Sequence, residues 1–222
     1  MRQLFVGLIT EGSTDVRFLK NVVFKSVQDL CGDCENDIEV FDIKEVKADG
    51  GTFVEKMLNA THIASAELGL SMLCIHADSD NRTSDNVIKN KFEPFFNELS
   101  KMNDEEYCKR IVPTIPIQMI ESWMLADKEL LKQMVNANDM RDIDLGLEKA
   151  PETYSDPKDI INNAIRIAMS RQSKKKRDQI KISDLYEVLG MRLSLEKLRM
   201  IPSFREFEQN VKNVFREIGI LI

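Results

Sequence analysis

The sequence predicts an α/β protein with a mostly parallel four-stranded sheet flanked by helices, resembling a Rossmann arrangement, and with an α-helical C-terminal extension. Short apolar or β-branched runs alternate with segments of helical periodicity through about residue 118, and the pattern is helical after that point. The length of 222 residues, of which 43% are hydrophobic and 31% charged, suits one large domain or one domain with an appendage.

Four runs are expected to form the strands. The runs at 4–9 and 71–77 are strongly apolar, as is typical of strands that are buried on both faces of a sheet. The run at 38–46 only partly alternates, and the run at 111–117 contains two prolines, so both are expected near a sheet margin. Alternation of strands with helices predicts parallel pairing with crossover connections.

Helices are expected between these strands and after them. From Ser13 to Leu30 apolar residues recur every three or four positions, and Gly32 supplies a stop signal. Similar patterns begin at Phe53 and Asn86. The segment 136–157 is expected to be a loop. Further helices are expected at 120–126, 128–135, 160–169, 183–189, 194–200 and 204–218.

Charge is distributed unequally along the chain. Residues 1–150 contain 17 basic and 27 acidic residues, whereas residues 151–222 contain 14 basic and 10 acidic residues. We expect a core domain over 1–127 and a helical, basic extension over 128–222. The extension contains a dense basic cluster, which is either a solvated surface or a contact for phosphates: Arg171, Lys174, Lys175, Lys176, Arg177 and Lys181.

Composition also predicts where the protein works. No apolar run approaches the ~20 residues that a membrane-spanning helix needs, and the N-terminal residues lack the features of a secretory leader. The 4 cysteines are too few for a disulfide framework. A cytoplasmic protein that does not act at a membrane is therefore expected.

Acidic residues follow the first and third apolar runs, where those strands should end. Glu11 follows the first run, with Asp15 one helical turn later, and Asp78 and Asp80 follow the third. Ligands of parallel sheets gather beyond the carboxyl ends of the strands, and on an extended backbone His76, Asp78 and Asp80 would project to one side. Such carboxylates favour a hard divalent cation such as magnesium. The alternatives are a helix-dipole role for Asp15 and ordinary turn chemistry for the Asp-x-Asp.

A further acid, Glu121, lies in an apolar segment after the fourth predicted strand and is the third feature of interest. Its neighbours Ile120 and Trp123 predict partial burial, where an unpaired charge is costly and a cation or basic partner would offset the cost. Trp123 itself is expected to be a core residue. Asp127 is expected to cap a helix that begins at Lys128.

These three features, in this order, resemble the Toprim fold of topoisomerases, primases and related nucleases. More narrowly, the chain resembles the small stand-alone Toprim-like proteins of bacteria, which read EG-x-T-[DE], then D-x-D, then IE-x-W-x-x-AD. The matching segments here are 11–15, 78–80 and 120–127. Segments 156–158 and 202–207 resemble later landmarks of that family, so the resemblance spans most of the chain.

The resemblance implies a nuclease that depends on magnesium, with manganese as a substitute, and that hydrolyses phosphodiester bonds of DNA or RNA. Such proteins often act in phage defence beside an ABC-type ATPase. Carried over, the resemblance makes Glu11 a metal ligand or general base, while Asp78 and Asp80 hold magnesium. Glu121 would complete the cluster. Asp15 is a further candidate ligand, although this position is often the longer Glu.

The resemblance leaves room for other functions. A non-catalytic Toprim-like subunit would regulate or dock on an ABC-type ATPase. A haloacid-dehalogenase-like phosphatase would use Asp78 as its nucleophile, but Thr83 stands one place too late for that motif. In the nuclease interpretation, Lys158 and the basic cluster at 171–177 would hold substrate phosphates.

Overall fold

The structure, a computed structural model, describes residues 2–34, 36–170 and 180–221. Within these residues the central sheet has four strands in the order β4-β2-β5-β6, and every neighbouring pair is parallel. Its strands are Lys44–Glu45 (β4), Val6–Ile9 (β2), Met72–His76 (β5) and Ile111–Thr114 (β6). The predicted parallel sheet is confirmed, and the runs at 38–46 and 111–117 do supply its two edges.

Two of the predicted strands are each split into two shorter ones. Arg2–Leu4 (β1) pairs with Ile38–Val40 (β3) in a separate parallel ladder, and the chain then continues into β2 and β4. At the break, the rings of Phe5 and Phe41 stack with centroids 4.7 Å apart. The backbone of Phe5 is held by Ser71, whose N–H donates to the Phe5 carbonyl over 2.7 Å. The stacked pair therefore marks the break in both strands.

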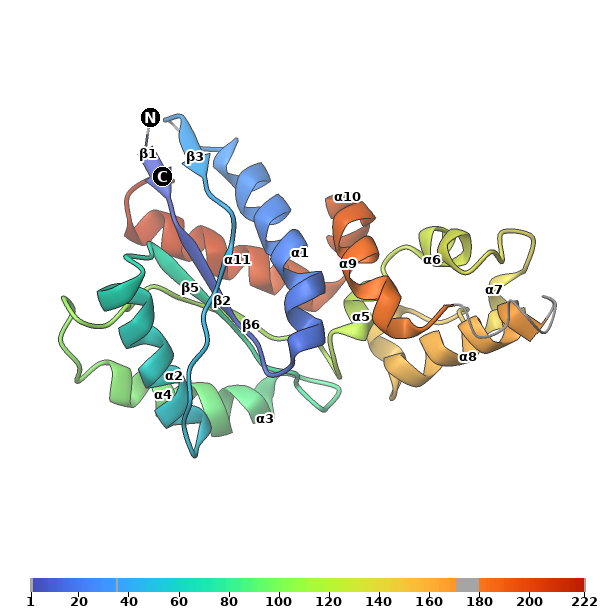
Figure 1. The fold of residues 1–222 in the computed structure, drawn as a ribbon, viewed down its shortest axis with the longest axis horizontal. Helices are drawn as coiled ribbons and strands as arrows, with labels where there is room; N and C mark the ends of the chain where they lie inside the picture. The colour runs from blue at the N-terminus through green and yellow to red at the C-terminus, as the bar shows by residue number, and fades with distance from the viewer. Residues whose placement is uncertain (1, 35, 171–179, 222) are drawn as a thin grey trace.

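Helices cover both faces of the sheet and give three layers (Figure 1). One face carries Ser13–Cys31 (α1) and Pro202–Glu217 (α11), and the other carries Phe53–His62 (α2) and Glu93–Leu99 (α4). Strand side chains alternate between two apolar clusters: Leu8 and Cys74 belong to the α1 and α11 side, and Ile9 and Ile75 to the α2 and α4 side. The central strands β2 and β5 are buried on both faces, as their apolar runs predict.

The helices on the α2 and α4 face contain π-helical turns. Ile63–Glu67 (η1) continues α2, and Ile88–Phe92 (η2) lies between Asp85–Val87 (α3) and α4. Pro94 lies just after the π turn, at the point where η2 continues into α4. The helix predicted from Asn86 is therefore present, with a π turn in its middle.

The second half of the chain is helical, as predicted, and part of it forms an arm at one end of the molecule (Figure 1). The predicted loop at 136–157 is ordered and contains short helical turns, with buried Tyr154 bonding to backbone groups of Gly146 and Lys149. The elements are Glu121–Met124 (α5), Lys128–Met134 (α6), Asp142–Leu145 (α7), Pro151–Thr153 (η3), Pro157–Ser170 (α8), Ile182–Arg192 (α9) and Leu195–Leu198 (α10).

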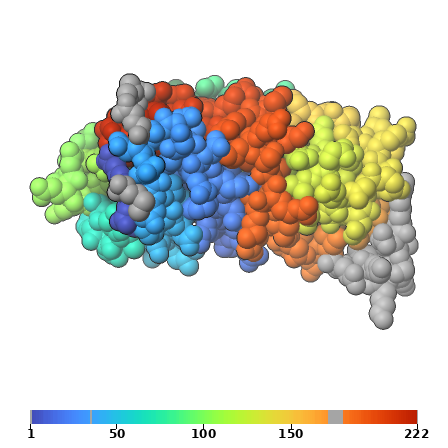
Figure 2. All heavy atoms as spheres, turned by 90° about the horizontal axis from the view of Figure 1, so that it is seen from above, coloured from blue at the N-terminus to red at the C-terminus, as the bar shows by residue number. Residues whose placement is uncertain are grey.

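The predicted extension shares one core with the rest of the chain. Helix α9 packs along α1, so closely that a Cβ on Gly190 would lie 2.7 Å from the Phe18 carbonyl oxygen, and α11 packs against β6. Figure 2 shows α9 and α10 between α1 and the arm. The boundary expected at 127 therefore separates two patterns of secondary structure, but not two hydrophobic cores. Over the described residues, none of the helices has the length and apolar character to cross a bilayer.

Candidate functional site

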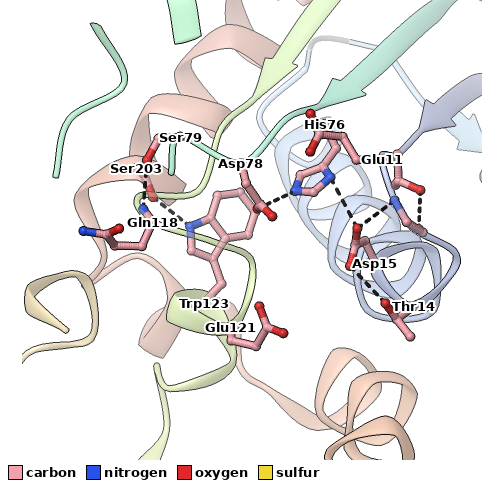
Figure 3. A network of polar contacts seen from close by, with 12 residues as sticks. Glu11, Thr14, Asp15, His76, Asp78, Ser79, Gln118, Glu121, Trp123 and Ser203 are labelled. Carbon is pink, nitrogen blue, oxygen red and sulfur yellow. Dashed lines mark hydrogen bonds and ion pairs between the residues drawn. The ribbon is translucent and has the colours of Figure 1, made fainter. Parts of the chain in front are cut away.

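Acidic residues that follow three different strands lie together at the carboxyl edge of the sheet, as the sequence predicts (Figure 3). Glu11 follows β2 and Asp78 follows β5, while Glu121 begins α5 beyond β6. The charges of Glu11, Asp15 and Asp78 all act on His76, and the charge of Asp78 also acts on Glu121. The structure thus brings together residues that are distant in the sequence, as parallel strands require.

His76 lies at the centre of this cluster. It is 1% exposed, with Nε2 3.1 Å from Asp78 Oδ1 and Nδ1 3.9 Å from Asp15 Oδ2. Within the described residues Nδ1 has no hydrogen-bond partner. Burial alone would lower the pKa of His76, but its bond to Asp78 and the charges of Asp78, Asp15 and Glu11 outweigh burial and raise it. The imidazole therefore tends to carry a proton among the acids.

Asp15 contacts the start of its own helix and also faces the acid cluster. Its Oδ2 accepts the N–H of Gly12 over 3.0 Å at the start of α1, a capping contact in the helical turn where the sequence suggested a helix-dipole role. Its carboxylate also faces the cluster. Burial raises the pKa of Asp15, His76 opposes that effect, and the negative charge of Asp78 adds to it. The carboxylate is therefore held close to other acids at an electrostatic cost.

Glu11 lies on the exposed rim of the cluster and is paired with a lysine. Lys91 Nζ is 2.8 Å from Glu11 Oε1, and the same ammonium lies 5.8 Å from the centre of the Phe53 ring. Lys91 comes from η2, far from Glu11 in the sequence. No local sequence pattern marks Lys91 as a neighbour of Glu11.

Asp80 differs from Asp78 in backbone conformation. Strand β5 ends at His76, and Asp80 has a φ of 50°, in the left-handed region. The loop is tied to the one after β6, because the N–H of Asp80 donates to the Gln118 carbonyl over 2.9 Å. The expectation that an extended backbone points Asp78 and Asp80 to one side is therefore wrong for Asp80, although His76 and Asp78 do meet. Asp80 is exposed, and in the described parts of the chain no hydrogen bond or ion pair joins its carboxylate to the cluster.

Glu121 is buried with a basic partner, as the sequence predicts. Its side chain accepts a hydrogen bond from the Tyr186 hydroxyl, and Lys158 Nζ lies 3.8 Å from the same oxygen, Oε1. Burial raises the pKa of Glu121, and Tyr186 and Lys158 oppose this, while Asp78 reinforces it. The carboxylate is only 3% exposed, so its ionisation depends on these neighbours.

The core and capping predictions made around Glu121 are confirmed. Trp123 is fully buried, donates its indole N–H to Ser203 Oγ over 2.7 Å, and packs edge-on against Phe204. Asp127 Oδ1 accepts the N–H of Leu130 over 3.0 Å and caps α6. These contacts join α5 to α11 and fix the start of the arm.

Tyr186 is a site residue that sequence reasoning missed. It belongs to α9 and is 2% exposed. Burial, the bond to Glu121 and the nearby negative charges raise the pKa of its phenol far above the usual value, so the phenol stays neutral and acts as a donor. Its sequence context is an ordinary amphipathic helix, and only the tertiary fold brings it to Glu121.

The predicted substrate contacts fall into two groups. Lys158 stands in the first turn of α8, half-exposed and beside the cluster. The remaining candidates lie outside the described residues: Arg171, Lys174, Lys175, Lys176 and Arg177. A pocket of about 310 Å³ also opens next to Glu11, and it is lined in part by Lys47 and Lys56.

The donors fit magnesium in kind, because hard cations prefer carboxylate oxygens. Across 2–34, 36–170 and 180–221, however, no three His, Cys, Asp or Glu side chains are arranged to hold a metal ion. Four of the carboxylates instead have a protein partner: Glu11 with Lys91, Asp15 with Gly12, Asp78 with His76, and Glu121 with Tyr186.

Comparisons with protein-family models, with curated proteins and with solved structures return no significant match. The Toprim resemblance therefore depends on the motifs at 11–15, 78–80 and 120–127.

Proposed function

We propose that this chain is a magnesium-dependent nuclease that hydrolyses phosphodiester bonds of DNA or RNA. The observation that carries the proposal is the meeting of Glu11, Asp15 and Asp78 around His76, with Glu121 near enough to feel the charge of Asp78, at the carboxyl edge of a parallel sheet. Ligand sites of open parallel sheets lie at this edge. The Toprim-like order of the motifs supports the same assignment.

The electrostatics of the cluster favour a cation. Burial raises the pKa values of Asp15 and Glu121, and the charge of Asp78 raises both further. His76 and Lys158 compensate for part of this repulsion. Perturbed acids that are gathered at one edge of a fold are candidates for a functional site, because a folded protein gains no stability from holding like charges together.

We propose that Asp78, Glu11 and Glu121 would hold the metal once their side chains turn from the protein partners they have in this structure, with Asp15 beside them and Asp80 at the rim. Bound magnesium would neutralise charge on the phosphate and lower the pKa of the attacking water. The protein's own part is to orient the acids and supply cations. His76 holds Asp78, and Tyr186 holds Glu121.

Lysines around the cluster would bind the substrate backbone. Lys91 pairs with Glu11, and Lys158 pairs with Glu121. Both lysine side chains remain partly exposed to solvent. Lys56 lines the pocket next to Glu11. Lysine binds phosphate as a point charge, without reading the base sequence, so these contacts would position a nucleic acid and not select it.

The proposal is tested by incubating the purified protein with supercoiled plasmid, single-stranded DNA and RNA, in magnesium, manganese or EDTA. Glu11→Gln and Asp78→Asn should each slow cleavage about a hundredfold or more. Asp85→Asn is the matched control, because Asp85 is an exposed acid just beyond the same loop. Cleavage that survives both Glu11→Gln and Asp78→Asn would refute the nuclease assignment.

A second candidate is a non-catalytic subunit that regulates an ABC-type ATPase, in phage defence as the resemblance implies. One observation favours it: Glu11, Asp15, Asp78 and Glu121 each have a protein partner, so none of them needs a metal to supply one. Failure to cleave any of the three nucleic acids, together with failure to bind manganese, would favour this candidate. Hydrolysis of p-nitrophenyl phosphate alone would favour a phosphatase.

A further inference from the structure

We infer that Tyr186 is a positioning residue for the metal centre, holding the carboxylate of Glu121 in place from helix α9 through its hydroxyl group. This inference rests on the proposed metal-dependent function and assigns part of the site to the second half of the chain. Tyr186 and Glu121 are both almost fully buried, and the hydroxyl donates to Oε1. Lys158 approaches the same oxygen to 3.8 Å, so that oxygen is fixed from two directions.

The helix that carries Tyr186 is itself fixed against α1, which carries Asp15. Gly190 lies one helical turn after Tyr186, and its Cα packs against the backbone of Phe18. At the end of α9, Lys25 of α1 donates to the carbonyl of Leu193 over 2.5 Å. Helix α9 therefore has little freedom to slide, and the position of the Tyr186 hydroxyl is determined relative to Asp15 as well as to Glu121.

A donor that orients a ligating carboxylate affects metal affinity, typically by tenfold to a hundredfold when it is removed. A tyrosine that only fills the core would affect folding stability and leave metal affinity alone. The two roles are separable here because the chain offers a matched residue. Tyr154 is also buried in the helical region, but its hydroxyl bonds only to backbone, accepting from the N–H of Lys149 and donating to the carbonyl of Gly146.

The test compares Tyr186→Phe with Tyr154→Phe in the full-length protein, with circular dichroism confirming the fold of each. Manganese affinity is measured by calorimetry, and the magnesium concentration for half-maximal plasmid cleavage is measured separately. Tyr186→Phe should weaken manganese binding about tenfold or more and raise the magnesium requirement. Tyr154→Phe should lower the melting temperature and leave both metal measurements unchanged.

A double-mutant cycle with Glu121→Asp gives a second measurement, since the shorter acid withdraws its carboxylate from the hydroxyl. In that background Tyr186→Phe should cost much less affinity. Unchanged manganese binding in Tyr186→Phe, an equal loss in Tyr154→Phe, or a covalent DNA adduct on Tyr186 would overturn the inference. If the protein binds manganese through Tyr186 but cleaves nothing, the inference stands and the nuclease function fails. Wild-type protein that binds no manganese overturns both.

Discussion

Lys91 places its ammonium nitrogen 2.8 Å from Oε1 of Glu11, so an exposed carboxylate of the acid cluster is paired with a cation that comes from the opposite layer of the fold. Lys91 lies in the π-helical turn η2, where the regular helical register is interrupted. Such turns are often found at functional sites. In the proposed metal centre, this ammonium competes with the metal for Glu11.

Replacing Lys91 by Gln should therefore strengthen metal binding. Removal of a partly exposed ion pair changes free energies by about 0.2–1 kcal/mol, so manganese affinity should rise by about 1.5- to fivefold. The same change should slow plasmid cleavage, since a cation that contacts the substrate phosphates is lost. Lys89→Gln is the control, because Lys89 is an exposed lysine of the same turn. Equal affinities in the two variants would contradict the competition.

Glu121→Gln should raise the melting temperature at neutral pH in EDTA. Folding raises the pKa of Glu121, mainly through burial, so the folded chain binds the proton more tightly than the unfolded chain. This residue's contribution to stability therefore falls as pH rises above its unfolded pKa of about 4.3 and is lowest above the folded pKa. The amide oxygen of Gln still accepts a hydrogen bond from Tyr186 but carries no charge, so the gain in melting temperature should be largest at neutral pH.

The raised pKa of Glu121 also predicts how the melting-temperature gain of Glu121→Gln depends on pH. Below about pH 4 the wild-type acid is protonated in both states, so wild type and Glu121→Gln should melt at nearly the same temperature. Scanning calorimetry from pH 3 to 8 measures the difference. Glu187→Gln, an exposed acid of α9, should change little at any pH. A variant that melts below wild type at neutral pH would show that the ionised carboxylate stabilises the fold.

Arg199→Met should destabilise the protein strongly, because it removes the partner of a buried acid. The guanidinium of Arg199 donates to both oxygens of Glu208, each over 2.8 Å, and also lies 2.5 Å from Asp29 of α1. Glu208 is buried, and its other donor is the Ser26 hydroxyl. An unpaired buried carboxylate costs about 2–3 kcal/mol, which urea denaturation will measure.

The control for Arg199→Met is Arg141→Met. Arg141 forms a comparable pair with Asp144 on an exposed surface, with 2.7 Å between Nη2 and Oδ1. Exposed pairs contribute little, because water already solvates both charges. A loss in Arg199→Met no larger than in Arg141→Met would mean that the contact with Glu208 does not stabilise α11 on α1.

Elements with a strong local signal could be predicted from the sequence. Apolar runs predict β2 and β5, and the spacing from Ser13 to Leu30 predicts α1. The acids at strand ends could also be placed, because parallel strands carry their carboxyl ends to one edge. The breaks at Phe5 and Phe41 could not, since they depend on ring stacking between separate strands.

The rest of the site depends on tertiary contacts that leave no local pattern. The left-handed backbone of Asp80 follows from pairing with the loop at Gln118, so strand periodicity alone misplaces its side chain. Lys91 and Tyr186 come from helices whose sequences suggest only ordinary packing or solvent exposure. These contacts join residues that are far apart in the sequence, so no local sequence pattern predicts them.

The shared core gives a last prediction, on the boundary expected at residue 127. A fragment of residues 1–127 lacks α9 and α11, which cover the face of α1 and β6 that carries Phe18 and Val112. Exposing that apolar surface removes much of the driving force for folding. The fragment should therefore bind the dye ANS and melt without a cooperative transition, unlike the full chain. A cooperative transition with dispersed NMR signals would instead show that residues 1–127 fold as a separate domain.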